Sequence, residues 1–98
     1  MATLSDDEIT AALADLPGWS YDGTHLRKEY AFKGFRGAIA FIVRIAFDAE
    51  AADHHPDLEN HYNKVMVAFR TWDQDGITQT DVDLATKAER AAASFPQA

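Results

Sequence analysis

The chain has 98 residues, a formal net charge of −7 and no cysteine. This length suits one small domain over residues 1–98. The negative charge argues against direct binding to nucleic acid or anionic membranes, and the lack of cysteine excludes disulfides, thiolate zinc sites and cysteine nucleophiles.

The first ten residues, MATLSDDEIT, lack the basic region and apolar run of a signal peptide. The most apolar stretch, residues 38–47, is interrupted by Arg44 and is too short to span a bilayer. We therefore expect a soluble, cytoplasmic protein of a reducing compartment.

The segment LSDDEITAALADL predicts the first helix, with Ser5 as N-cap and Glu8 completing a capping box. The next segment, WSYDGTHLRKEYAF, predicts a hairpin in which Asp22-Gly23 forms a type I′ turn between strands 19–21 and 26–32.

The segment FRGAIAFIVRIAFDAEAAD predicts a long helix from Phe35 to about Asp53. A strand is the alternative, but the length favours a helix. The helix is apolar nearly all round, with a narrow polar stripe of Arg36, Arg44 and Asp48. We expect it to bury more than one surface, one against a sheet and another against a helix or a second subunit.

Pro56 disfavours the helical conformation of His55, so this helix should end by His54. A second hairpin is predicted in ENHYNKVMVAFRTW, with its turn near Asn63-Lys64. Its last strand places Val65, Val67 and Phe69 on a core face, and Met66, Ala68 and Arg70 on a face directed to solvent or a partner.

The last element is a helix with Thr78 as N-cap and Asp81 at the capping-box position. The full order, α-β-β-α-β-β-α, predicts an α+β fold: a four-stranded antiparallel sheet with three helices packed on one face.

The segment DHHPD is the candidate for chemistry. Adjacent side chains diverge, so His54 and His55 do not suit a shared metal ion. Histidine exchanges protons near neutral pH, and a helix C-terminus with neighbouring acids favours its charged form. Taken alone, the pair nevertheless fits a polar helix end better than a site. His25 and His61 fit surface or packing roles, and His25 has no obvious partner.

Trp72 follows a strand end and leaves two interpretations open. It could be a packing tryptophan, or a flat wall for an aromatic heterocycle with Asp73 beside it to accept hydrogen bonds.

The residues around the histidine pair extend into a longer pattern. Glu50 precedes His54-His55-Pro56, with the three residues Ala51-Ala52-Asp53 between. An aromatic, a tryptophan and an aspartate follow: Tyr62, Trp72 and Asp81. Together with LPGW and the strand end YAF, this order resembles the pterin-4a-carbinolamine dehydratase family.

The resemblance implies dehydration of 4a-hydroxytetrahydropterin to quinonoid dihydropterin, as part of tetrahydrobiopterin recycling, without metal or organic cofactor. It implies a homodimer or homotetramer. The alternative is a non-catalytic or weakly catalytic dimerisation or assembly module, of the transcription coactivator or rubisco assembly factor type. The implied catalytic residues are His54 and His55, and the implied substrate-binding residues are Asp53, Pro56, Thr71, Trp72, Asp73 and Asp81.

One position departs from the family pattern. Many members carry a histidine where this chain has Trp72, and an indole N–H cannot act as a base. Proton transfer would then fall to His54, to water or to Asp73, or Trp72 would compensate by stacking on the pterin.

Overall fold

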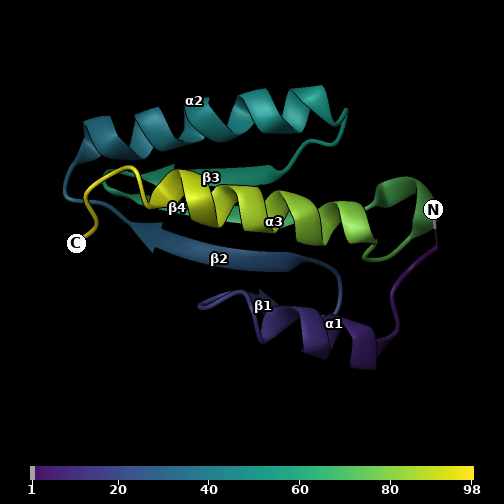
Figure 1. Ribbon diagram of the computed structural model, residues 1–98. Helices are drawn as coiled ribbons and strands as arrows, with labels where there is room; N and C mark the ends of the chain where they lie inside the picture. The colour runs from purple at the N-terminus through teal and green to yellow at the C-terminus, as the bar shows by residue number, and fades with distance from the viewer. Residues whose placement is uncertain (1) are drawn as a thin grey trace.

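A four-stranded antiparallel sheet and three helices make up the computed structural model, which describes residues 2–98 (Figure 1). They follow in the predicted order α-β-β-α-β-β-α, and the strands are arranged as β1-β2-β4-β3. The predicted α+β fold is therefore confirmed. Within residues 2–98, no helix is both long enough and apolar enough to cross a membrane.

The bounds of the elements lie close to those predicted from the sequence. They are α1 (Asp6–Leu13), β1 (Ser20–Tyr21), β2 (Leu26–Ala31), α2 (Phe35–Ala51), β3 (Asp57–His61), β4 (Lys64–Phe69), the 3₁₀ turn η1 (Trp72–Gln74) and α3 (Gln79–Ala92).

Both predicted capping boxes are present. The Ser5 hydroxyl accepts the Glu8 amide at 3.2 Å, and the Glu8 carboxylate accepts the Ser5 amide at 2.9 Å. Thr78 and Asp81 make the same reciprocal pair at the start of α3. Each box satisfies amides that the first helical turn leaves without intrahelical partners.

Both hairpin turns differ from the prediction. The first is a four-residue loop over residues 22–25, because Oδ1 of Asp22 accepts the amides of His25 (2.7 Å) and Thr24 (2.9 Å). These two bonds hold the pKa of Asp22 well below its usual range. The type I′ assignment was therefore wrong.

The second turn lies at Tyr62-Asn63, one residue earlier than predicted. Lys64 pairs with His61 and so already belongs to β4. Tyr62 takes the left-handed conformation that the turn requires, with φ 53°.

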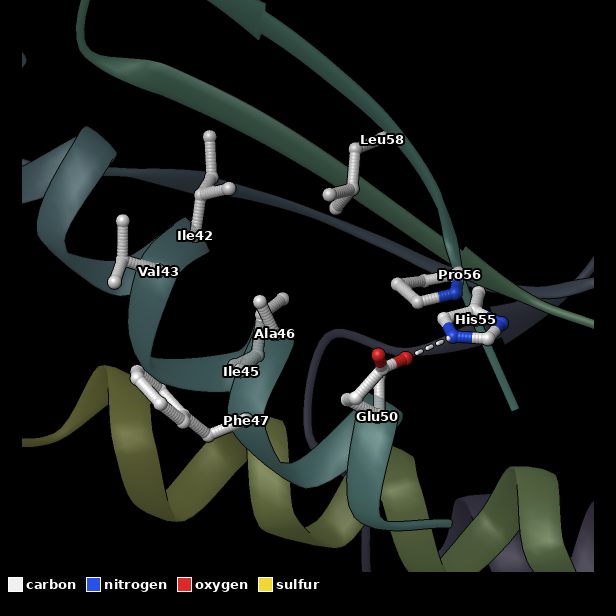
Figure 2. Close-up of a pocket in the computed structure, with 10 residues that line it drawn as sticks. Ile42, Val43, Ile45, Ala46, Phe47, Glu50, His55, Pro56 and Leu58 are labelled. Atoms are coloured by element: carbon white, nitrogen blue, oxygen red, sulfur yellow. Dashed lines mark hydrogen bonds and ion pairs between the residues drawn. The ribbon is translucent and has the colours of Figure 1, made fainter. Parts of the chain in front are cut away.

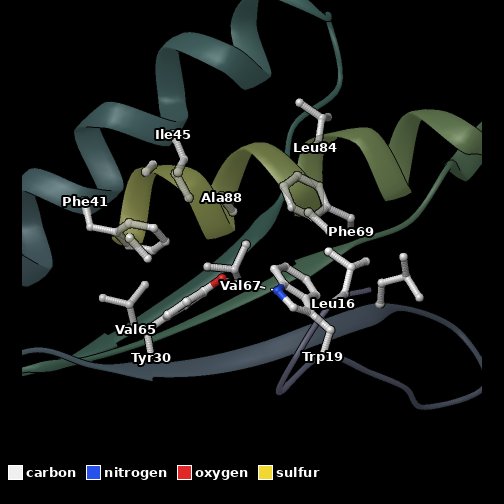
Figure 3. Packing of buried hydrophobic residues seen from close by; sticks show 14 of the residues in the cluster. Leu16, Trp19, Tyr30, Phe41, Ile45, Val65, Val67, Phe69, Leu84 and Ala88 are labelled. Carbon is white, nitrogen blue, oxygen red and sulfur yellow. Dashed lines mark hydrogen bonds between the residues drawn. The ribbon is translucent and has the colours of Figure 1, made fainter. Parts of the chain in front are cut away.

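The core lies between one face of the sheet and the helices. In Figure 1, α2 and α3 run beside each other over the sheet, and α1 lies beyond β1. Figure 3 shows how side chains from α2, α3 and the strands meet. All three residues predicted for the core face of β4 are buried: Val65, Val67 and Phe69. On the opposite face, Met66 is half-buried and Ala68 is buried.

A polar contact joins α3 to β2 within this core. Oε1 of Glu89 accepts Nζ of Lys28 (2.6 Å), Oη of Tyr30 (2.6 Å) and Nε1 of Trp19 (2.9 Å). Burial alone would raise the pKa of Glu89, but these three donors outweigh burial and lower it. Burial, reinforced by the bond to Glu89, raises the pKa of Tyr30.

Candidate active site

A sharp change of direction after α2 leads into the two histidines. Asp53 has φ 49°, in the left-handed region that aspartate tolerates better than most residues. The His54 amide donates to the Ala49 carbonyl at 3.0 Å, and Pro56 leads the chain into β3. The His54 side chain is 14% exposed and that of His55 is 60% exposed, so one is directed inward and the other outward.

His54 is bonded to the fully buried carboxylate of Asp81. The distance from Nε2 of His54 to Oδ1 of Asp81 is 2.6 Å. The other oxygen, Oδ2, accepts the hydroxyl of Thr71 at 2.7 Å and the amide of Thr78 at 2.8 Å. Because both of these neighbours are donors, the carboxylate acts as acceptor throughout the network, and Nε2 of His54 carries the proton.

This network determines what the His54 imidazole can do. With Nε2–H directed at Asp81, Nδ1 is the nitrogen left to accept a proton. The buried carboxylate then faces the imidazolium that forms. The arrangement suits a general base whose orientation is fixed by its hydrogen bond to the buried Asp81.

His55 makes a different pair, with a residue of the preceding helix. Nε2 of His55 lies 2.7 Å from Oε1 of Glu50, and both side chains are largely exposed. Figure 2 shows this pair beside Pro56. An exposed histidine bonded to a carboxylate can exchange protons with water more readily than the enclosed His54 can.

The two histidines line the same cavity of about 430 Å³. That volume lies within the usual range of small-molecule sites, roughly 300–1,000 Å³. Trp72 provides a flat wall and is 65% exposed. The remaining lining residues are Asp53, Pro56, Asp57, Arg70 and Asp73.

The predicted site residues fall into two groups. Thr71 and Asp81 are buried behind His54 and are not part of the cavity lining. The others come together around the cavity: Asp53, His54, His55, Pro56, Trp72 and Asp73. No three histidine, aspartate or glutamate side chains within residues 2–98 are grouped so that they could hold a metal ion.

Three residues near the cavity were missed by the sequence analysis. Asp57 and Arg70 line the cavity, and their places close to Pro56 and Trp72 in the chain were the available signal. His25 was expected to have no obvious partner, and that was wrong: its Nε2 lies 3.1 Å from Oδ2 of Asp57. This contact depends on the strand order β2-β4-β3, which local sequence does not give.

A second, apolar pocket of about 550 Å³ adjoins the site (Figure 2). Side chains of α2 and Leu58 of β3 form most of its lining, and His55 and Pro56 line both pockets. His55 therefore stands between a polar cavity and an apolar one.

The model of the pterin 4 alpha carbinolamine dehydratase family matches residues 2–91. A protein of Roseiflexus sp. (strain RS-1), provisionally named as a pterin-4-alpha-carbinolamine dehydratase, is 50% identical over 88 residues, covering 89% of this chain and 95% of its own. A protein of Mycobacteroides abscessus with the same provisional name is 45% identical over 85 residues, covering 87% and 90%.

Two solved structures are also similar. A transcriptional coactivator/pterin dehydratase from Brucella melitensis has a TM-score of 0.88 at 36% identity, over 92% of this chain and 98% of that one. A pterin dehydratase-like protein described as a RuBisCO assembly factor in the alpha-carboxysome has a TM-score of 0.63 at 17% identity, over 76% and 86%, and shows the fold alone. With a family match across most of its length and relatives about half identical to it, the chain belongs to the pterin-4-alpha-carbinolamine dehydratase family.

Proposed function

We propose that the protein dehydrates 4a-hydroxytetrahydropterin to quinonoid dihydropterin and water, as a step of tetrahydrobiopterin recycling. The observation that carries this proposal is the 2.6 Å bond between His54 and the buried Asp81 at the wall of a ligand-sized cavity. Membership of the family supplies the substrate class.

The reaction breaks the bond between C4a and its hydroxyl group and removes one proton from the ring. His55 delivers a proton to the departing hydroxyl, which leaves as water. His54 accepts the ring proton at Nδ1, while its Nε2–H keeps its hydrogen bond to Asp81. His54 then releases the proton it accepted, and the exposed His55–Glu50 pair takes up a proton from solvent, so both histidines return to their starting states.

Trp72 cannot carry a proton in this scheme, so we assign it to binding. Its exposed ring lines the cavity, and the Arg70 guanidinium lies 4.9 Å from the ring centroid. A pterin is flat and aromatic, and it would stack on the free part of the indole.

The test follows the absorbance of 4a-hydroxytetrahydropterin with purified protein. Wild type should consume the substrate faster than buffer does, and His54→Ala or His55→Ala should lower kcat by about 10²- to 10⁴-fold. His61→Ala is the matched control, because His61 lies at the end of β3, shortly after the histidine pair, but is not part of the cavity lining. Equal rates for wild type and buffer would refute the proposed reaction.

We also propose that the chain forms a homodimer or homotetramer through α2. Large apolar side chains recur every four residues along its exposed face: Phe35, Ile39, Val43 and Phe47. This spacing gives a continuous stripe, and Phe47 is 71% exposed at the edge of the apolar pocket. A second copy would cover both the stripe and the pocket.

A non-catalytic assembly module is the second candidate function, and the same apolar stripe supports it. An inactive wild type that recovers a specific partner in a pull-down would favour this role. Recovery of the protein alone would count against it.

A further inference from the structure

Three residues that line the cavity, Asp57, Arg70 and Trp72, form a connected group with His25, which we name the Trp72 wall. Arg70 packs over Trp72 and donates from Nη1 to the Thr24 carbonyl at 3.1 Å. The loop that contains Thr24 carries His25, whose ring meets the edge of Trp72 with centroids 5.6 Å apart. The loop after β1 and the end of β4 are thus held together beside the cavity.

Within this wall, His25 fixes the carboxylate of Asp57. Nε2 of His25 lies 3.1 Å from Oδ2 of Asp57, and Nδ1 lies 2.8 Å from the hydroxyl of Thr24. The Asp57 carboxylate accepts only, so Nε2 carries a proton, while Nδ1 contacts the Thr24 hydroxyl, which itself donates to Oδ1 of Asp22 at 2.9 Å. Both ring nitrogens then have a polar partner, and the ring cannot turn without losing both contacts.

This contact distinguishes Asp57 from the other carboxylates of the cavity. Asp53 and Asp73 also line it, but within residues 2–98 no side chain makes a hydrogen bond or ion pair with either carboxylate. Asp57 is held in place and still 60% exposed, so its oxygens are both oriented and available. An oriented acceptor loses less conformational freedom on binding than a mobile one does.

A pterin has one edge that matches such an acceptor. Its 2-amino group and its N3–H stand side by side and are both donors, so one carboxylate can accept both bonds. We propose that Asp57 binds this 2-amino-pyrimidinone edge while the ring stacks on Trp72, with His25 as the positioning residue. The inference rests on the proposed function only in taking a pterin as the ligand.

This assignment makes Asp57 a specificity determinant. Lumazine has the same two rings as pterin but carries a carbonyl oxygen in place of the 2-amino group. That carbonyl oxygen would face an oxygen of the Asp57 carboxylate. Two acceptors would then meet, and the carboxylate oxygen covered by lumazine would have no hydrogen-bond donor. The carboxamide of an Asp57→Asn variant would offer one acceptor and one donor, which is the pattern that the N3–H and carbonyl of lumazine require.

The experiment measures the Kd of pterin and of lumazine by isothermal titration calorimetry, for wild type and variants. Wild type should prefer pterin by about tenfold or more. Asp57→Asn should abolish or reverse this preference. His25→Gln should reduce it without weakening lumazine binding, which a general loss of structure would not do.

Glu59→Gln is the matched control. Glu59 lies on the same strand as Asp57 and is also near a histidine, His61 at 3.6 Å, but it is not part of the cavity lining. The variant makes the same charge change and should keep the wild-type ratio of the two Kd values. A changed ratio would show that net charge rather than position decides the preference, and would overturn the proposal.

Four other results would overturn it: a wild type that binds both rings equally, an unchanged ratio in Asp57→Asn, an Asp57→Asn variant that binds neither ring, and a preference lost in Asp73→Asn instead.

Turnover of the same preparations separates the two proposals. A wild type that prefers pterin but does not dehydrate it contradicts only the proposed reaction. An active wild type without preference contradicts only the role of Asp57.

Discussion

At the scale of single residues, Asp81 decides which nitrogen of His54 carries the proton. In Asp81→Asn, the hydroxyl of Thr71 and the amide of Thr78 would still donate to the side-chain oxygen. The amide NH₂ would then face Nε2 of His54 and force the proton onto Nδ1, which is the nitrogen proposed to accept the ring proton. We expect kcat to fall by about 100-fold, measured by the absorbance assay.

Thr71→Val provides the comparison for this prediction. It removes one donor to Asp81 but leaves the bond between Asp81 and His54 in place. Its kcat should fall much less than that of Asp81→Asn when both variants are shown by thermal melting to be folded. Full activity in Asp81→Asn would mean that the tautomer of His54 does not matter.

At the residue scale, the sequence alone identifies the histidine pair but not all of its partners. The pair His54-His55 is conspicuous because the two residues are adjacent and precede a proline. Their partners are not equally visible: Glu50 lies near the end of the preceding helix, but Asp81 is 27 positions from His54. Asp57 and His25 are 32 positions apart, and only the strand register brings them together.

At the scale of elements, Glu89 ties α3 to β2. The three donors around Oε1 come from β2 and from the segment before β1, so this carboxylate joins three parts of the chain. Because the fold lowers the pKa of Glu89, the ionised form stabilises the folded state. This stability is fully present above the unfolded pKa near 4.5 and is lost as the pH falls through the lower folded value.

Glu89→Gln should therefore reduce the free energy of unfolding by about 1–2 kcal/mol at pH 7. The difference between wild type and variant should shrink below pH 4.5, where wild-type Glu89 takes up a proton. Denaturant unfolding across this pH range measures both effects. Glu29→Gln, on the exposed face of β2, should change neither. A difference that persists undiminished in acid would contradict the assigned role of the charge.

The elements themselves were largely predictable, and their turns were not. Ser5 with Glu8, and Thr78 with Asp81, mark helix starts through reciprocal local bonds that the spacing reveals. The first hairpin differs because the Asp22 side chain captures two amides and widens the loop. A dipeptide preference for a tight turn does not include that competing side-chain bond.

At the scale of the whole molecule, the element order restricts the architecture strongly. Two hairpins and three helices can bury their apolar faces in few ways, so the fold class followed from the pattern. The cavity did not, because it forms where two segments distant in the sequence meet: residues 53–57, between α2 and the start of β3, and residues 70–73, which follow β4. No periodicity within one segment describes such a junction.

The apolar stripe of α2 leads to a prediction about assembly and its effect on the site. Wild type should elute as a dimer or tetramer of the 10.9 kDa chain, and Phe47→Glu should elute as a monomer, because a charge on the stripe would have to be buried. Light scattering coupled to size-exclusion chromatography measures both. Arg44→Gln, on a side of the same helix away from the stripe, where Arg44 pairs with Asp48, should leave the assembly unchanged. His55 and Glu50 line the apolar pocket that the second copy would cover, so the kcat of the monomeric variant measures whether the covered pocket contributes to catalysis. A monomeric wild type would contradict the proposed interface, and a fully active monomer would separate assembly from catalysis.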